Sequence, residues 1–405
     1  MKIVYIFLAV TLTNCLYTES LLFKNASVYT GTSKEIFEDH DIYVVNGKIA
    51  DINQDIDLSA DIIINVEGKI ITAGFISPFS HLGLIEINML AETRDDSSSI
   101  YSAGFSISQA FNPSSTLIPY NLNGGLTSAI STPSGSRLFS GLGSAFSLSG
   151  NSDSLILKDL ALYGSIEAEG ESKAANILLM EDTFDLARAF DKDSREIQEY
   201  GLPDSVKYSM RDLAAIKRVL NKEIPLVVSI NRASDIITMI EFVKNQNIKL
   251  VIMGASEGWM VAKQLAESKI PVILEPINNL PTSFDRLGSR LENAALLHKA
   301  GVKILISYDE WETHNAYLSR QGAGIAVSYG LPWHEAVNAL SKNVSDTFNI
   351  PNRGSLTIGH EADLIVWDAD PLEVTSFAEQ IYISGKLMSP NTRSLMLRDR
   401  YLKRD

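Results

Sequence analysis

Three side chains that could take part in catalysis follow apolar runs of the sequence. His81 lies within the stretch Ile71–Gly83, and Asp309 lies three residues after the run Val302–Ile306. His314 comes five positions after Asp309, in what we expect to be the same loop. Histidine and aspartate serve as metal ligands and as general acids or bases. The sequence alone leaves open that each of the three is only a hydrogen-bonded structural residue.

Two charged residues, Arg232 and Glu257, come just after other apolar runs. Arg232 follows Leu226–Ile230, and Glu257 follows Lys249–Met253. Both could bind a polar substrate, or they could form a salt bridge. Ser229 does not suggest a serine hydrolase, because the G-x-S-x-G turn that exposes such a nucleophile is missing around it.

The segments that carry these residues alternate between short apolar runs and amphipathic patterns. The expected strands are 226–230, 249–253, 271–274 and 302–306, and the expected helices are 234–245, 257–267, 286–300 and 316–329. Such alternation is typical of parallel βα units. Between about residues 74 and 350 it favours a barrel, in which catalytic groups lie at the carboxyl ends of the strands.

Both ends of the chain have strand patterns instead. Ser20–Thr30, a hairpin over Asp41–Ile52 around Asn46-Gly47, and Ile62–Val66 predict a small antiparallel sheet near the N-terminus. Gly354–Asp368 and Glu379–Leu387 add strand segments near the C-terminus.

The stretch Ser134–Gly150, in the middle of the chain, has no regular pattern of apolar residues. Ser134–Gly150 is rich in glycine and serine, and we expect a loop there. A phosphate-binding loop is the weaker alternative, because the Lys-Ser/Thr ending of a P-loop is absent.

Two motifs resemble those of the metal-dependent amidohydrolase superfamily. Ala73-Gly-Phe-Ile76 resembles the lead-in to its first barrel strand, and Gly354–Asp368 with Asp370-Pro-Leu372 resembles its C-terminal motif. The imidazolonepropionase-like members are the most similar. The resemblance implies an α/β fold, with an (α/β)8 TIM-type barrel over 74–353 and a β-sandwich built from 20–73 and 354–405.

The same resemblance implies where metal ligands should lie. These relatives place two histidines at the first strand, one each at the fifth and sixth strands, and an aspartate at the eighth. By that alignment the chain has Phe79 and His81 at the first strand, Ser229 at the fifth, Gly254 at the sixth and Asp309 at the eighth. The implied metal ligands are therefore His81 and Asp309, which alone would hold a cation weakly. The implied cofactor is a divalent metal, zinc first, or none.

Composition and the N-terminus limit the partners. A formal net charge of −14 and a sequence pI of about 5.0 argue against a nucleic-acid partner. Residues 1–19 begin with Met1-Lys2 and an apolar run, which is typical of an export signal, although a buried strand is the alternative. Cys15, the only cysteine, lies where a bacterial lipoprotein signal would place one. We therefore expect a periplasmic protein or one attached by lipid to the bacterial envelope, with no other membrane contact.

Two functions remain open from the sequence. The first is hydrolysis of non-peptide carbon–nitrogen bonds in a small amide or peptide-like substrate, weak or absent because of the missing histidines. It would use Asp309 and His314 as catalytic groups and Arg232 and Glu257 for substrate binding. The second is a catalytically inactive barrel that binds a ligand, or that forms a homo- or hetero-oligomer with an intact amidohydrolase paralogue.

Overall fold

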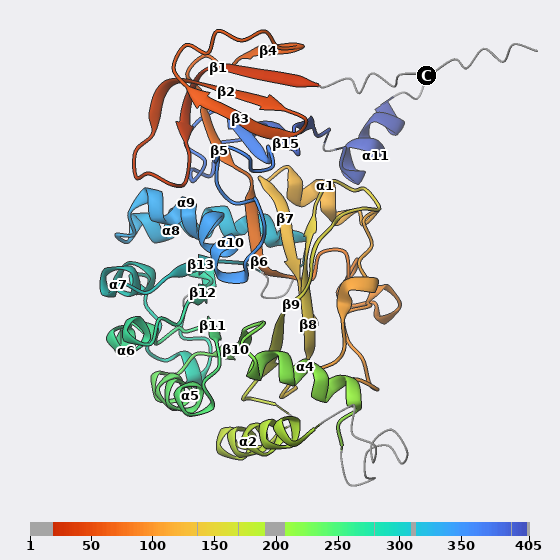
Figure 1. Cartoon of the computed structure of the whole chain (residues 1–405), viewed down its shortest axis with the longest axis vertical. Coiled ribbons are helices and arrows are strands. Elements are labelled where there is room, and N and C mark those ends of the chain that lie inside the picture. The colour runs from red at the N-terminus through yellow and green to blue at the C-terminus, as the bar shows by residue number, and fades with distance from the viewer. Residues whose placement is uncertain are drawn as a thin grey trace, which may run out of the picture.

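The computed structural model describes residues 19–135, 137–168, 170–190, 207–278, 280–308, 313–389 and 391–402. Two eight-stranded sheets organise this part of the chain, with helices around the first of them (Figure 1). The leader sequence and Cys15 lie outside the described residues.

The first sheet is a nearly closed barrel, which confirms the predicted fold class. Its strands are β6 (Phe75–Ser80), β7 (Leu126–Ser131), β8 (Gly141–Ser147), β9 (Leu155–Ser165), β10 (Leu226–Ile230), β11 (Leu250–Gly254), β12 (Val272–Leu274) and β13 (Ile304–Ile306), in that order. The first and last strands meet, because the Ser307 hydroxyl after β13 donates to the Phe79 carbonyl of β6 at 2.9 Å. Ser229 and Gly254 lie on the fifth and sixth strands in this order.

Strand β8 differs from the rest of the barrel. It pairs antiparallel with both β7 and β9, and all its residues are buried, so the loop expected within 134–150 is wrong for Gly141–Ser147. Small residues are needed here because aromatic rings lie against the strand. A Cβ on Gly143 would come within 2.5 Å of the Tyr163 ring. Packing, not β-propensity, therefore makes this segment a strand.

In the sequence, all the described helices except the last lie between strands. They are α1 (Leu117–Leu122), α2 (Lys173–Ala189), α4 (Met210–Leu220), α5 (Ala233–Gln246), α6 (Ala262–Glu267), α7 (Asn293–Ala300), α8 (Ser319–Ser328), α9 (Trp333–Ala339), α10 (Lys342–Phe348) and α11 (Arg393–Leu402). Short 3-10 turns include η3 (Gly258–Val261), η5 (Phe284–Arg286) and η6 (Thr313–Leu318). Within the described ranges, no helix has the length and apolar character needed to cross a membrane.

The helix expected over 286–300 is shorter than predicted. Only α7 forms, because the preceding segment is held in an open loop by its backbone. Gly288 donates its N–H to the Glu257 carboxylate at 2.9 Å, and its carbonyl accepts from the Trp259 indole at 2.8 Å. Both groups would otherwise enter the helical ladder.

The second sheet is built from both ends of the chain, as predicted. Its strand order is β16 (Lys386–Leu387), β15 (Ala378–Ile383), β14 (Leu364–Trp367), β5 (Ile70–Ala73), β1 (Ser20–Tyr29), β2 (Phe37–Val45) and β3 (Lys48–Asn53), with β4 (Ile62–Asn65) also on β1. The antiparallel pairing expected near the N-terminus is wrong for β4, which runs parallel to β1, and β5 is parallel to β1 as well. β4 and β5 follow β1 in the same direction, one after the other. The turn at Glu67-Gly68 lies between them and does not reverse the direction of the chain. The domain limits 20–73, 74–353 and 354–405 stay predictions.

Candidate functional site

His81 lies at the carboxyl end of the first barrel strand. Its Nδ1 is 2.8 Å from the Thr132 carbonyl oxygen, which can only accept, so Nδ1 carries the proton. Burial lowers the pKa of His81, although the Thr132 hydrogen bond and the charge of Asp96 oppose this. His81 is therefore a neutral imidazole at neutral pH.

Asp96 is an almost fully buried carboxylate beside His81. Burial alone would raise its pKa, but the Arg94 guanidinium and the Ser134 hydroxyl bind it and hold the pKa below its ordinary value. Arg94 binds both oxygens of Asp96, at 3.2 and 2.9 Å. The Arg94–Asp96 ion pair thus lies beside His81.

The Phe79 ring lies next to His81, and the Tyr163 ring lies on Phe79. Phe79 meets the His81 ring edge-on at 5.4 Å and lies 6.0 Å from the Tyr163 ring on β9. Tyr163 is 4% exposed, its hydroxyl has no hydrogen-bond partner among the described residues, and burial raises its pKa. Both rings pack on the apolar cluster inside the barrel. The first strand therefore presents a hydrophobic cap where the resemblance places a metal-binding histidine.

The sixth strand ends in a backbone conformation that favours glycine. Gly254 has φ +95°, and a Cβ there would lie 2.5 Å from the Asn231 Oδ1 atom. That oxygen already accepts from the Ser256 hydroxyl at 2.9 Å. Asn231 therefore fills the space into which a side chain at position 254 would extend.

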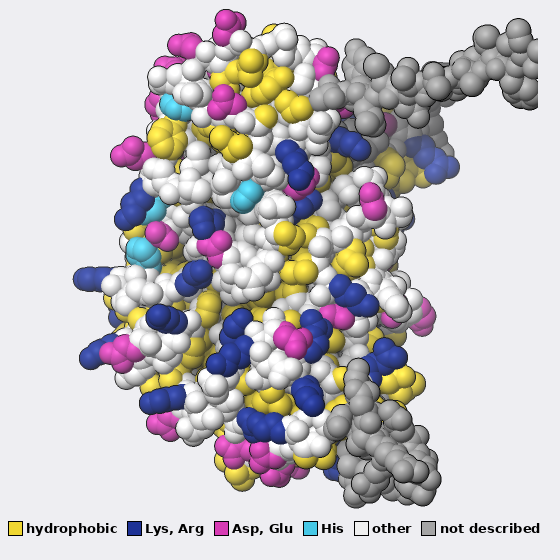
Figure 2. Space-filling model, in the orientation of Figure 1, with side chains coloured by type: hydrophobic (Ala, Val, Ile, Leu, Met, Phe, Trp, Pro, Cys, Tyr) yellow, Lys and Arg dark blue, Asp and Glu magenta, His cyan; other side chains and the backbone are white. Residues whose placement is uncertain are grey.

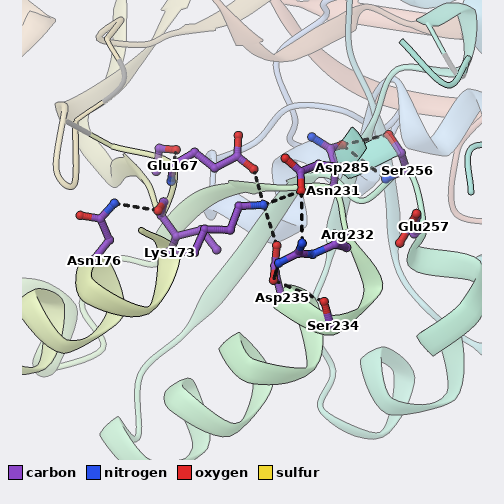
Figure 3. A network of polar contacts seen from close by, with 12 residues as sticks. Glu167, Lys173, Asn176, Asn231, Arg232, Ser234, Asp235, Ser256, Glu257 and Asp285 are labelled. Carbon is purple, nitrogen blue, oxygen red and sulfur yellow. Dashed lines mark hydrogen bonds and ion pairs between the residues drawn. The ribbon is translucent and has the colours of Figure 1, made fainter. Parts of the chain in front are cut away.

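Arg232 belongs to an ion-pair network at the rim of the barrel (Figure 3). The Lys173 ammonium lies 2.9 Å from Glu167, 2.8 Å from Asp235 and 2.7 Å from Asp285. Arg232 lies 2.7 Å from Asp235 and 3.8 Å from Asp285. The network joins the segments that follow β9, β10 and β12.

Glu257 is buried and does not pair with Arg232. Its carboxylate accepts backbone N–H groups of Ala233 at 3.0 Å and Gly288 at 2.9 Å. It thereby fixes the start of α5 and the loop before α7. Because the predicted substrate-binding pair is bound to other parts of the protein, a ligand would have to compete with these contacts.

Removing the Lys173 charge should destabilise the protein through this network. Burial would raise the pKa of Asp235, but hydrogen bonds from Arg232 and Lys173 hold it below its ordinary value of 3.8. Lys173→Met should cost about 1–2 kcal/mol of unfolding free energy at pH 7, since three carboxylates would lose their shared cation.

The same substitution has a predicted pH dependence. A carboxylate with a lowered folded-state pKa stabilises the protein above its unfolded pKa and loses this effect as pH falls through the folded value. The difference between Lys173→Met and wild type should therefore shrink below pH 3.8. Urea unfolding across pH measures it. Lys263→Met, at an exposed pair, is the control and should change stability by less than about 0.5 kcal/mol; equal effects from both variants would refute a special role for the network.

The remaining predicted catalytic residues are only partly described. Asp309 lies outside the described residues, so its relation to His81 stays a prediction. His314 lies in η6, half-buried, with its ring 6.4 Å from that of Tyr120.

A small polar pocket at the ends of β10, β11 and β12 was not predicted. It is lined by Asn231, Ser256, Glu275, Arg286 and Asn293 among others, and its volume of about 20 Å³ has room for a water molecule. Asn231 and Glu275 each directly follow a strand, which is the signal that the sequence offered.

The described residues do not fit a catalytic metal site. Catalytic zinc needs three protein ligands from histidine, cysteine or carboxylates. Within the described ranges, no group of three such side chains is placed to hold a metal ion. The groups near His81 include the Phe79 ring and the Asp96 carboxylate, which Arg94 already binds.

Part of the sequence and the fold as a whole are similar to those of known proteins. Residues 231–388 match the model of the Amidohydrolase family. The fold is similar to that of an amidohydrolase from Thermotoga maritima MSB8, with a TM-score of 0.81, 26% identity, and coverage of 91% of this chain and 99% of that one. A zinc complex of atrazine chlorohydrolase from Arthrobacter aurescens TC1 shares the fold at a TM-score of 0.53 and 14% identity, with coverage of 94% and 99%. Residues 231–388 are thus similar to the Amidohydrolase family, and the fold is similar to those of solved amidohydrolases.

Two curated proteins match short segments. Amidohydrolase tasK of Hapsidospora irregularis is 40% identical over 58 residues, 14% of this chain and 6% of that protein. A 5-methylthioadenosine/S-adenosylhomocysteine deaminase of Thermococcus sibiricus is 38% identical over 73 residues, 18% of this chain and 17% of the deaminase. The matched part is thus less than a fifth of each of these relatives.

Proposed function

We propose that this protein is an imidazolonepropionase-like barrel in which metal-dependent hydrolysis of non-peptide carbon–nitrogen bonds is weak or absent. The end of β11 is the observation that carries the proposal. Gly254 has a positive φ, and Asn231 occupies the space of its missing side chain. A histidine ligand at this position would need a different backbone, not only a different side chain.

The first strand supports the same conclusion. Phe79 is packed between His81 and Tyr163, and its carbonyl accepts hydrogen bonds from Ser77 at 2.8 Å and Ser307 at 2.9 Å. These contacts anchor the backbone of the aromatic residue in the barrel. The first strand thus keeps an aromatic ring, which cannot bind a metal, where the resemblance places a histidine ligand.

The second part of the proposal is pairing with an intact amidohydrolase paralogue. Loops after β6 and β12, at the mouth end of the barrel, expose large apolar side chains: Met89 is 92% exposed, Ile100 81% and Phe284 89%. Such side chains on one end of a barrel favour a protein partner. Export to the bacterial envelope, with Cys15 as a lipid attachment point, remains part of the proposal.

An activity screen tests the proposal. Protein purified without chelator and supplied with zinc, manganese or iron is assayed on small amides and dipeptides, beside His81→Ala. We expect equal, background turnover from both proteins. Turnover that is clear in the wild type and lost in His81→Ala would overturn the proposal and establish a rebuilt hydrolytic site.

The pairing is tested separately by mixing the protein with a paralogue that keeps both first-strand histidines. We expect a complex on size-exclusion chromatography that Met89→Asp with Phe284→Asp abolishes. Separate elution of the two wild-type proteins would refute the pairing.

A further inference from the structure

A lysine-lined groove lies at the amino ends of the barrel strands, opposite the candidate site. Its cavity volume is about 1140 Å³, and its lining residues come from the turns that lead from helices into β10, β11, β12 and β13. Lys249 and Lys303 directly precede β11 and β13, and Lys269 lies just before β12. Lys244, near the end of α5, is the fourth lysine of the groove.

The backbone fixes these lysines in a row. The Lys249 carbonyl accepts from the N–H of Leu226 at 2.9 Å, and the Lys303 carbonyl accepts from Val272 at 3.0 Å. Lys249 and Lys303 therefore belong to the hydrogen-bonded ladder between neighbouring strands. Adjacent strands are about 4.8 Å apart, so the residues that precede β11, β12 and β13 start close to one another at this end of the barrel.

The four lysines are accessible to a binding partner. All are exposed, and none has a carboxylate at ion-pair distance among the described residues. The groove also contains Glu241, Glu267 and Asp346. Two of these carboxylates already have lysine partners, Glu267 with Lys263 at 3.8 Å and Asp346 with Lys342 at 2.5 Å.

The groove is therefore locally basic on an acidic protein. Four lysines and three carboxylates line the groove, and two of those carboxylates pair with lysines outside the lining, whereas the whole chain has a formal net charge of −14. Charges beyond about 8 Å are largely screened at physiological salt, so a bound group would respond mainly to the local lysines. In Figure 2, dark-blue Lys and Arg side chains are spread over the region of α5 and α6, with yellow hydrophobic ones between them.

Apolar atoms form part of the groove as well. Ile240 and Ile248 are half-buried and line it together with Val243, Ile270 and Val302. A long polyanion without apolar groups would leave this surface in water and would meet the acidic remainder of the protein outside the groove. A short acidic segment with apolar side chains would satisfy both the lysines and the apolar lining.

We propose that this groove binds an acidic, amphipathic segment of a partner protein. The proposal does not depend on the function of the barrel mouth. Complementary charge on the partner would speed encounter and set its position, and apolar contacts would hold it in place.

Binding of a fluorescein-labelled amphipathic peptide of glutamate and leucine to the full-length protein tests this. We expect saturable binding that weakens with salt, and that weakens roughly 10-fold or more in the triple variant Lys249→Glu, Lys269→Glu, Lys303→Glu. The triple variant Lys34→Glu, Lys158→Glu, Lys386→Glu makes the same change in charge on exposed lysines outside the groove and should bind like wild type. Glutamine at the three groove positions repeats the test with less risk to folding.

Several outcomes would overturn the proposal. One is the absence of binding to the folded wild-type protein, and another is an equal loss in the groove and control variants. Tighter binding of heparin, or of vesicles containing phosphatidylglycerol, would instead identify a polyanion or a membrane as the occupant. Salt-sensitive self-association of the protein alone, abolished by the groove variant, would identify a second copy.

Discussion

Replacing Trp367 with alanine should lower the free energy of unfolding by about 3–5 kcal/mol, the largest stability effect that we expect. Trp367 on β14 is fully buried. Its indole N–H donates to the Thr72 hydroxyl at 2.9 Å, its ring stacks on Phe75 of β6 at 5.5 Å, and the Arg320 guanidinium lies 5.3 Å from it. The side chain therefore joins the sheet from the chain ends to the first barrel strand. Urea unfolding followed by circular dichroism measures the effect.

Trp367→Phe is the matched control. Phenylalanine keeps most of the buried apolar area and the ring contact but loses the hydrogen bond to Thr72, so we expect a cost of about 1 kcal/mol. If Trp367→Ala lowered the free energy of unfolding by less than Trp367→Phe does, the indole would not be the link between the two sheets.

Gly254→His should also be strongly destabilising, by about 2–3 kcal/mol, and should not create a metal site. A side chain at φ +95° is strained, and its Cβ would come within 2.5 Å of Asn231 Oδ1. Restoring the histidine that the resemblance places on the sixth strand would therefore disturb the backbone that holds Ser256 and Glu257. Thermal unfolding with and without zinc measures both effects.

Ser229→His is the control, because Ser229 is a half-buried residue within the regular strand β10. We expect it to cost less than about 1 kcal/mol. A Gly254→His protein as stable as wild type, with a melting temperature raised by zinc, would show that the sixth strand can still accept a ligand.

The sequence predicted the barrel best where apolar runs were short and regular. The run 226–230 coincides with β10, and the expected helix 234–245 differs from α5 by one residue at each end. The resemblance also placed Ser229 and Gly254 on the strands where the structure has them.

Elsewhere, contacts distant in the sequence decided the structure. Gly141–Ser147 forms a strand because Phe105 and Tyr163 pack against its glycines, which no local pattern could indicate. The contacts of the candidate site could not be predicted either, because they also join residues that are distant in the sequence. Neither the three carboxylates around Lys173 nor the side chain of Asn231 beside Gly254 follows from residue spacing.

Metal content tests the central claim most directly. The full-length protein is purified without chelator, supplied with zinc, manganese or iron, and analysed by mass spectrometry beside His81→Ala and Asp309→Ala. We predict metal well below one ion per chain in all three proteins, with no change in melting temperature on metal addition. One ion per wild-type chain, lost in either variant, would contradict the account and show that the barrel mouth holds a metal.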